Sequence, residues 1–398
     1  MNVKIRLGLM MFLQYAIWGA WYVTVGNYMN ANGMSSVIHW AYTVSPISSI
    51  VSPFFLGMIA DRFFATEKVL GVLHFIGGIS ILLTPLVALT SPTLFIILLL
   101  IHMLAYMPTV GLTNTLAFSN LSNQEKEFPV IRVFGTIGWI IAGIIVSKIL
   151  GADESSLPLT IAGIAGILMG VFSFTLPHTP PPAKGEKASF RKIIGIDAIK
   201  KLNTKSFMIF IISSFLISIP LAVYYAYAPV YINSTGIENP AFVMSFGQMS
   251  EVVFILIMPL LFPILGVKKM LLTGMGAWAL RYFLFAMGAD DSVSWMIISG
   301  VILHGICYDF FFVAGFIYVD KTATADIRNQ AQGFIILATY GLGMLIGSQI
   351  AGLLFNNLIT SNNLIEWQNF WYIPAVFAVL VMIFFGIMFK ENKVLKNS

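Results

Sequence analysis

The segment LPHTPPPAKGEKASFRKIIGIDAIKKLNTKS, residues 176–206, is the polar stretch that stands out in this chain and divides it in two. It carries seven basic and two acidic residues, whereas the whole chain of 398 residues is 58% hydrophobic and only 10% charged. Such a composition is far from that of a soluble domain and indicates a membrane protein. The segment is therefore interpreted as a basic loop outside the membrane.

On each side of this loop lie six apolar stretches, each long enough, at about 20 residues, to cross a bilayer as a helix. The first stretch follows two basic residues but is too long for the apolar part of a signal peptide, so we expect it to be retained. The twelve predicted spans cover residues 5–29, 38–60, 68–89, 92–117, 130–150 and 157–177, then 207–232, 240–265, 268–288, 293–318, 329–356 and 367–390.

The loop itself has two parts. A proline-rich start is typical of a stiff spacer, and residues 190–201 mix apolar and basic side chains as a helix on an anionic membrane surface would. A solvated basic linker is the alternative. The expected organisation is an N-terminal half (1–177), a linker with an interfacial helix (178–206), a C-terminal half (207–390) and a tail (391–398).

The basic residues are distributed unevenly about the spans. Nineteen of the 22 Lys and Arg residues lie at the termini or in the loops that follow every second span. Because cytoplasmic loops are the ones enriched in Lys and Arg, we expect both termini to be cytoplasmic. Of the three exceptions, Arg132, Lys148 and Arg281, the last two lie nearer the outer ends of their spans and are expected to be interfacial anchors.

The sequence lacks the signature motifs of several functional classes. There is no GxxxxGK[ST] loop for ATP, and neither HExxH nor GxSxG occurs, so we expect no enzymatic activity. One cysteine, Cys307, cannot form an intrachain disulfide or a thiolate cluster, and we expect no metal and no cofactor. The net charge of +5 follows from the loops and not from a nucleic-acid site. Uphill transport would then require an ion gradient.

Charged residues inside spans are expensive in hydrocarbon and usually mark a working site. Three helix faces carry them with polar or aromatic neighbours, and we predict that these faces converge on one cavity. For Arg132 the alternative is a side chain that snorkels to the interface, and for His304 it is a packing hydrogen bond between helices. The faces comprise Arg132, Thr136 and Trp139 in span 5, Gln248 and Glu251 in span 8, and His304, Tyr308 and Asp309 in span 10.

The loop after span 2 carries a motif that supports a particular fold. In GMIADRFFATEK, residues 57–68, Gly57, Asp61 and Arg62 resemble the glycine, aspartate and basic residue of the cytoplasmic loop motif of the major facilitator superfamily. Phe64 replaces the second glycine of that motif. Together with twelve spans and a central linker, the resemblance implies an all-α membrane protein of the major facilitator superfamily fold, with two six-helix halves.

A series of longer motifs resembles the nucleoside:proton symporter family, the bacterial nucleoside permeases of that superfamily. It includes FPVIRVFGTIGWI (128–140), QMSEVVFIL (248–256) and CYDFFFVAGFIYVDK (307–321), in the family's order. The resemblance implies import of nucleosides, driven by protons, across the bacterial cytoplasmic (inner) membrane by a multi-pass protein surrounded by lipid. We expect a monomer.

The resemblance also implies roles for the residues on the three faces. Arg132 and Thr136 match residues that bind substrate, and Trp139 stands where the family has a stacking phenylalanine. Asp309 matches a membrane-embedded aspartate that carries the proton, with Glu251 as the other candidate. The remaining implied substrate contacts are Gln248, Glu251, Tyr308 and His304, which takes the place of a tyrosine. We further expect Arg132 to pair with Glu251 when the site is empty.

Span 7 is where the chain departs from the family pattern. Ala222 and Tyr225 replace a glutamine and an asparagine of the nucleoside permeases. Because a site that loses hydrogen-bond donors usually changes what it accepts, another polar solute such as a sugar or amino sugar is the alternative substrate. Tyr225 keeps a ring-shaped ligand plausible. A membrane-embedded enzyme or sensor is a third, remote alternative.

Overall fold

The computed structural model describes residues 2–56, 61–181, 200–202, 204–289, 292–324, 327–361 and 363–390, and helices are the regular elements throughout these ranges. The chain forms two compact units. Unit 1 comprises Met1–Phe190 and Asn239–Phe242, and unit 2 comprises Arg191–Glu238 and Val243–Ser398. Gly57, the interfacial helix predicted in the linker and the tail 391–398 lie outside the described residues.

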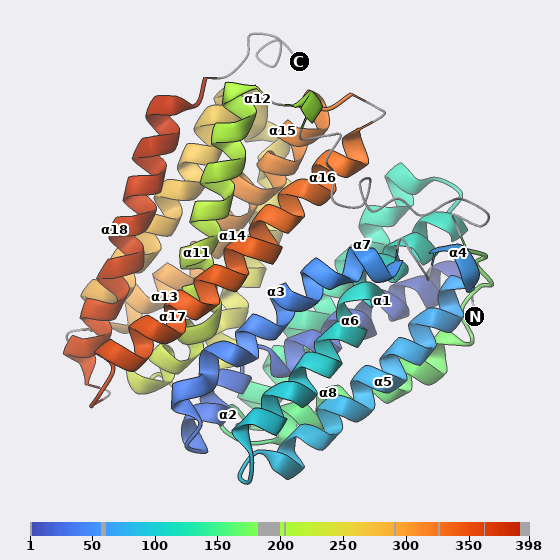
Figure 1. Cartoon of the computed structure of the whole chain (residues 1–398), viewed down its shortest axis with the longest axis horizontal. Helices are drawn as coiled ribbons and strands as arrows, with labels where there is room; N and C mark the ends of the chain where they lie inside the picture. The colour runs from blue at the N-terminus through green and yellow to red at the C-terminus, as the bar shows by residue number, and fades with distance from the viewer. Residues whose placement is uncertain are drawn as a thin grey trace. The chain divides into compact units, whose positions relative to one another are not determined.

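Unit 1 is built from the helices that Figure 1 draws in blue to green. In this unit α5 packs against both α6 and α8, and α1 packs against α7. Asp61 begins the short helix α4 and Arg62 is half-buried within it. The elements are α1 (Val3–Trp21), α2 (Val25–Ala31), α3 (Ile38–Phe55), α4 (Asp61–Phe63), α5 (Thr66–Val87), α6 (Pro92–Asn120), α7 (Gln124–Gly143), the π-helical turn η3 (Ile144–Ile149) and α8 (Leu157–Ser173).

Unit 2 contains the remaining helices, in which α11 packs against α17 and α18 (Figure 1). Two of its spans are interrupted by π-helical turns. The elements are α11 (Lys205–Ser234), α12 (Pro240–Ala289), α13 (Ser294–Ile302), α14 (His304–Tyr308), η4 (Asp309–Val313), α15 (Ala314–Thr322), α16 (Arg328–Ile336), η5 (Leu337–Gly343), α17 (Met344–Leu358) and α18 (Leu364–Met388).

The described helices agree with twelve spans. Eight continuous helices are long and apolar enough to cross a membrane, and one of these, α12, is 50 residues long. Gly266 divides α12 into two rods, because its φ of 67° and ψ of 176° are not helical and are readily adopted only by glycine. The rods formed by α1, α3 and α8 complete the twelve.

Close contact between α1 and α7 places the span 5 residues against the first helix. A Cβ on Gly138 would overlap the backbone oxygen of Phe12, and one on Gly19 would lie 2.9 Å from the Cα of Trp139. Small residues at such contacts let two membrane helices approach through their backbones. The glycines therefore fix how α7 presents its side chains.

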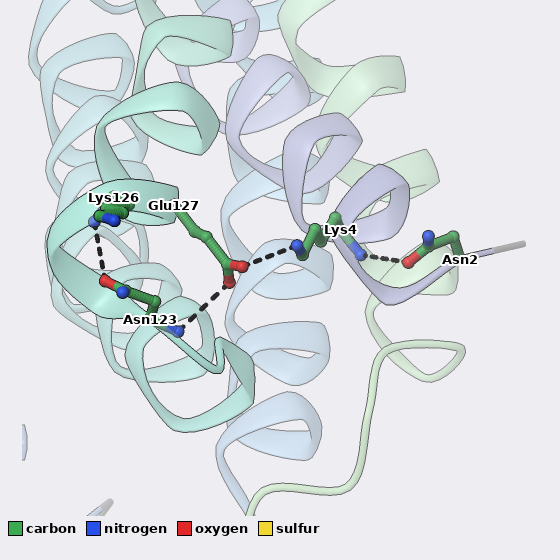
Figure 2. Close-up of polar contacts among 5 residues, drawn as sticks. All are labelled: Asn2, Lys4, Asn123, Lys126 and Glu127. Atoms are coloured by element: carbon green, nitrogen blue, oxygen red, sulfur yellow. Dashed lines mark hydrogen bonds and ion pairs between the residues drawn. The ribbon is translucent and has the colours of Figure 1, made fainter.

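Polar contacts also join the starts of α1 and α7, as Figure 2 shows. The charge pattern predicts that both of these helix ends face the cytoplasm. The Lys4 ammonium lies 2.7 Å from the Glu127 carboxylate. Asn2 and Asn123 cap the two helices by accepting hydrogen bonds from backbone N–H groups. Because the ion pair is partly exposed, we assign it little stability and attribute the α1–α7 contact mainly to packing.

Replacing Gly138 with alanine is expected to destabilise the protein by about 1–3 kcal/mol, the usual cost of inserting a methyl group into a filled contact. The measurement is thermal unfolding of the purified protein in detergent. Gly276→Ala is the matched control, since a Cβ there would meet its nearest atom, the Met382 sulfur, at an ordinary 3.6 Å. Equal unfolding temperatures for the two variants would contradict the proposed role of the α1–α7 contact.

The first turn of α12 belongs to unit 1 because a buried aspartate holds it there. Asp153, in the loop before α8, accepts hydrogen bonds from the Ser147 hydroxyl at 2.7 Å and from the Ala241 N–H at 2.9 Å. Burial raises the pKa of the Asp153 carboxyl, and these two donors oppose that rise. The carboxyl group satisfies a backbone donor at the start of α12 that has no partner within the helix.

Candidate functional site

Glu251 and His304 lie next to each other in unit 2. The Glu251 Oε2 atom is 4.0 Å from the His304 Nε2 atom, and the Glu251 side chain is 27% exposed whereas that of His304 is 2% exposed. Gln248, one turn before Glu251 on α12, is half-buried. Spans 8 and 10 therefore meet at a carboxylate and an imidazole, as their polar faces predict.

Three tyrosines surround the His304 ring. Tyr224 is nearly parallel to it at a centroid distance of 5.6 Å, Tyr225 meets it edge-on at 6.2 Å and Tyr308 lies 5.7 Å away. Tyr225 and Tyr308 are half-buried, whereas Tyr224 is buried. Aromatic rings with one polar atom suit a ligand that has both a flat face and hydrogen-bonding groups.

Tyr308 is in turn fixed by a residue that the sequence patterns do not identify. The hydroxyl groups of Tyr308 and Tyr340 lie 2.5 Å apart, and Phe312 packs against both rings. Tyr340 belongs to η5, so span 11 also contributes to the group of side chains around Glu251 and His304, called the unit 2 cluster below. The two glycines that follow Tyr340 in TYGLG are the one sequence signal for an irregular helix at this point.

Asp309 begins the π-helical turn η4 and is fully buried. Within the described part of the chain, neither of its carboxylate oxygens has a hydrogen-bond partner. An ionised carboxylate in such surroundings is costly, which is the condition that often accompanies a functional group in a membrane protein. π-Helical turns are themselves frequent at functional sites.

Arg281 is not the interfacial anchor that its sequence position predicts. Its side chain is fully buried, its guanidinium carbon lies 4.1 Å from the centre of the Tyr224 ring, and its Nε atom donates a hydrogen bond to the Gly300 carbonyl at 3.0 Å. Lys148, by contrast, is exposed as expected. Sequence position gives the depth of a residue in a span but not which face neighbouring helices cover.

In unit 1, α7 presents the span 5 residues to α1. The guanidinium carbon of Arg132 lies 4.1 Å from the centre of the Tyr15 ring, in a cation–π contact. Trp139 meets the Trp18 ring edge-on at 5.5 Å. Arg132, Thr136 and Trp139 are all half-buried, so this face remains partly open within unit 1.

A buried polar cluster supports this face from behind. Gln14 donates to the Thr109 hydroxyl at 2.7 Å, and its Oε1 atom lies 2.8 Å from the His74 Nε2 atom. The Tyr106 hydroxyl donates to the backbone oxygen of Gln14. These bonds join α1 to α5 and α6, and they hold the turn that carries Tyr15 beneath Arg132.

The two span 7 departures have different surroundings. Tyr225 lies beside His304 and is part of the unit 2 cluster. Ala222 is buried, and a Cβ on Gly347 of α17 would lie 2.8 Å from its Cβ atom. A longer side chain at position 222 would therefore have to compete with the contact between α11 and α17, which makes Tyr225 the residue with more influence on a ligand.

Comparisons with known proteins identify relatives of this chain. Residues 1–394 match the family described as nucleoside H+ symporter. The YegT protein of Escherichia coli (strain K12) is 39% identical over 98% of this chain and 95% of its own length. The nucleoside permease NupG of the same strain is 32% identical over 99% of this chain and 97% of its own.

Solved structures show the same fold. The crystal structure of the nucleoside transporter NupG has a TM-score of 0.89 at 30% identity and covers 98% of this chain and 100% of that one. A D-xylose–proton symporter, 14% identical with a TM-score of 0.75 over 98% of this chain and 99% of that one, shares the fold alone. The predicted major facilitator superfamily fold is thus confirmed. By its sequence over nearly its full length and by its structure, this multi-pass membrane protein belongs to the nucleoside H+ symporter family, whose members are proton-coupled transporters and not enzymes.

Proposed function

We propose that this protein imports nucleosides together with protons by alternating access, with a binding site near the middle of the membrane. The observation that supports this most strongly is the unit 2 cluster, in which Glu251, His304, Tyr225 and Tyr308 bring hydrogen-bonding atoms and aromatic rings together. A nucleoside combines a flat base with a polar ribose. The cluster offers both kinds of contact in a member of this family.

The proposed substrate contacts in unit 2 follow from the chemistry of the side chains. Gln248 and Glu251 would hydrogen-bond ribose hydroxyls and base edges, because an amide and a carboxylate together provide donors and acceptors. Tyr225 and Tyr308 would stack on the base. His304 would be an additional donor or acceptor beside Glu251.

The face of α7 supplies the proposed contacts from unit 1. Arg132 and Thr136 would bind the sugar or base, and Trp139 would form an aromatic wall.

Asp309 is the proposed proton carrier, with Glu251 as the second candidate. Protonation from outside would neutralise a buried carboxylate before substrate binds, and the lower proton activity of the cytoplasm would release both afterwards. The loop motif residues Gly57, Asp61 and Arg62 would act in the conformational change and not in binding. This order makes the proton gradient the source of energy.

The setting that fits this cycle is the bacterial inner membrane, with both termini in the cytoplasm and a lipid-embedded monomer as the working form. The halves 1–177 and 207–390 would rock about the site, joined by the linker 178–206 with its interfacial helix and followed by the tail 391–398. The basic loops predicted to be cytoplasmic support this orientation.

A second candidate substrate class is a sugar or amino sugar. Ala222 and Tyr225 remove two amides from span 7 of the nucleoside permeases, and Tyr225 lies directly beside His304. A tyrosine hydroxyl and ring suit a pyranose as well as a base. This candidate keeps the same proton-coupled cycle and changes only what the site accepts.

Cells that lack their own nucleoside permeases are expected to take up radiolabelled uridine and adenosine when they produce this protein. A protonophore should abolish accumulation, because the proton gradient drives it. Competition by unlabelled nucleosides, but not by sugars, would support the nucleoside assignment.

Cells with the empty vector give the background, and membrane immunoblots confirm that the protein is present. If a well-produced protein moves no nucleoside yet moves a sugar in a protonophore-sensitive way, the second candidate replaces the first. Nucleoside uptake that the protonophore does not reduce would contradict proton coupling.

A further inference from the structure

Span 10, Ser294–Thr322, is one long rod with a local irregularity between α13 and α14, which is called the break below. Leu303, with φ −60° and ψ −8°, stays in the right-handed helical region, and no proline lies beside it. Its N–H donates to the Ser299 carbonyl at 3.0 Å and its carbonyl accepts from the Cys307 N–H at 3.0 Å, so the break is local. In an unbroken α-helix the N–H group of Gly305 would donate to the carbonyl of Val301. Here the Gly305 N–H donates to a side chain of another span, the Ser250 hydroxyl oxygen of α12, at 2.9 Å.

A second side chain secures the other side of the break. The Nε atom of Arg281 donates to the carbonyl of Gly300 at 3.0 Å, and its guanidinium group lies over the Tyr224 ring. Unsatisfied backbone groups are costly in hydrocarbon, and irregular membrane helices persist where neighbouring side chains satisfy them. Ser250 and Arg281 do this from two different spans.

The packing around the break leaves little freedom. A Cβ on Gly305 would lie 2.6 Å from the backbone of Ser250, and one on Gly300 would lie 2.5 Å from the Phe285 ring. Ser250 also donates its own hydroxyl proton to the Gly247 carbonyl at 2.8 Å, so its lone pairs face Gly305. The hydroxyl orientation is therefore fixed by α12.

His304 is the first residue of α14, immediately after the break. Its ring lies 5.6 Å from Tyr224, on which Arg281 also packs, and its Nε2 atom faces Glu251, the residue that follows Ser250. The backbone around Leu303, and the side chains that bond to it, therefore affect where the imidazole points. Both residues that secure the break therefore also contact neighbours of His304: Ser250 bonds to Gly305, and Arg281 packs on Tyr224.

We propose that Ser250 and Arg281 are positioning residues that hold the break in span 10 and thereby aim His304 at Glu251, setting the affinity of the site for its substrate. This inference rests on the proposed function for its link to substrate affinity. The part that concerns the break depends only on the hydrogen bonds and packing around Leu303.

The test compares Ser250→Ala with Ser250→Thr, which keeps the hydroxyl, and with Ser214→Ala as a matched control. Ser214 is also a buried serine of unit 2, but its hydroxyl donates to the Phe210 carbonyl of its own helix, at 2.7 Å, and not to a neighbouring span. For uridine uptake we expect KM to rise about tenfold in Ser250→Ala with kcat within about twofold, the size of one lost hydrogen bond. Ser250→Thr and Ser214→Ala should stay close to wild type.

A second measurement reports on the break without substrate. Cys307, the one cysteine of the chain, is buried in α14 two residues after Gly305. Reaction of the purified protein with a maleimide should be several times faster in Ser250→Ala than in wild type, because α14 loses a bond that holds it. Arg281→Met, which removes the bond to Gly300, should have the same effect, and Ser214→Ala should have none.

Raised KM together with faster Cys307 labelling, both reversed by threonine, would support the inference. Unchanged KM and unchanged labelling in Ser250→Ala would overturn it, as would a loss of kcat alone that Ser214→Ala reproduces. If wild type transports no nucleoside, the proposed function fails. The labelling rates then decide the inference by themselves, and equal rates in Ser250→Ala and wild type overturn it.

Discussion

Replacing Asp309 with asparagine is expected to abolish the accumulation of nucleoside against its gradient while leaving exchange of nucleoside across the membrane intact. Asparagine has the shape of the protonated acid but cannot release a proton. Asp309 is fully buried, and its carboxylate oxygens have no partner in the described residues, so a neutral side chain should be tolerated there. The variant would therefore complete the conformational cycle, but without coupling nucleoside movement to proton movement.

Proteoliposomes with an imposed pH gradient provide the measurement. For one proton per substrate, a gradient of about two pH units sustains at most about a hundredfold accumulation, and the variant should reach only equal concentrations on both sides. Asp320→Asn is the matched control, because Asp320 lies on the same span but is half exposed and pairs with Arg328 at 3.2 Å. Wild-type accumulation by Asp309→Asn would exclude Asp309 as the proton carrier.

Replacing Glu251 with glutamine is expected to lower kcat/KM for uptake by about a hundredfold and, unlike Asp309→Asn, to lower exchange as well. Hydrogen bonds to a charged group contribute about 1.5–3 kcal/mol, and each 1.4 kcal/mol corresponds to a factor of ten. Glu251 faces both His304 and the partly open side of the cluster, so its loss should affect binding itself. Initial rates of exchange and of uptake over a range of uridine concentrations give the values.

A double-mutant cycle with His304→Asn adds a specific test of the pair. Because the two side chains are 4.0 Å apart, the double variant should lose less than the sum of the single losses, expressed as free energies. Glu366→Gln is the control, since Glu366 is a half-buried carboxylate outside the cluster that accepts hydrogen bonds from Thr360 and Ser361 at the start of α18. Strict additivity would mean that Glu251 and His304 act independently.

Much of the fold follows from the sequence because the bilayer imposes a simple rule. A helix needs about 20 apolar residues to cross it, and the predicted spans agree with the rods in the structure, as span 4 (92–117) does with α6 (Pro92–Asn120). Hydropathy also predicts a boundary between spans 8 and 9 at 265–268, and Gly266 is the residue that divides α12. Hydropathy reports these features because they depend on local composition.

The finer geometry of the site depends on contacts between distant segments. Ser250 and Arg281 secure the break before His304. Because Ser250 lies 55 residues before its partner Gly305, no local sequence pattern predicts the break. Burial of Arg281 likewise depends on how α11 and α13 cover α12. The pattern correctly brings Glu251 and His304 together, yet it omits Tyr340, whose hydroxyl meets that of Tyr308 only after span 11 has packed. The roles of these residues in binding stay predictions.

The π-helical turn η4 also affects how this chain is aligned with its relatives. An i→i+5 turn holds about one residue more than an α-helical turn, so a relative with a regular helix at 309–313 would match only with a one-residue gap inside span 10. Without the gap, each residue from Ala314 onward would be compared with a neighbour about 100° around the helix. Relative to the alignment before Tyr308, positions from Ala314 onward would then be displaced by one residue.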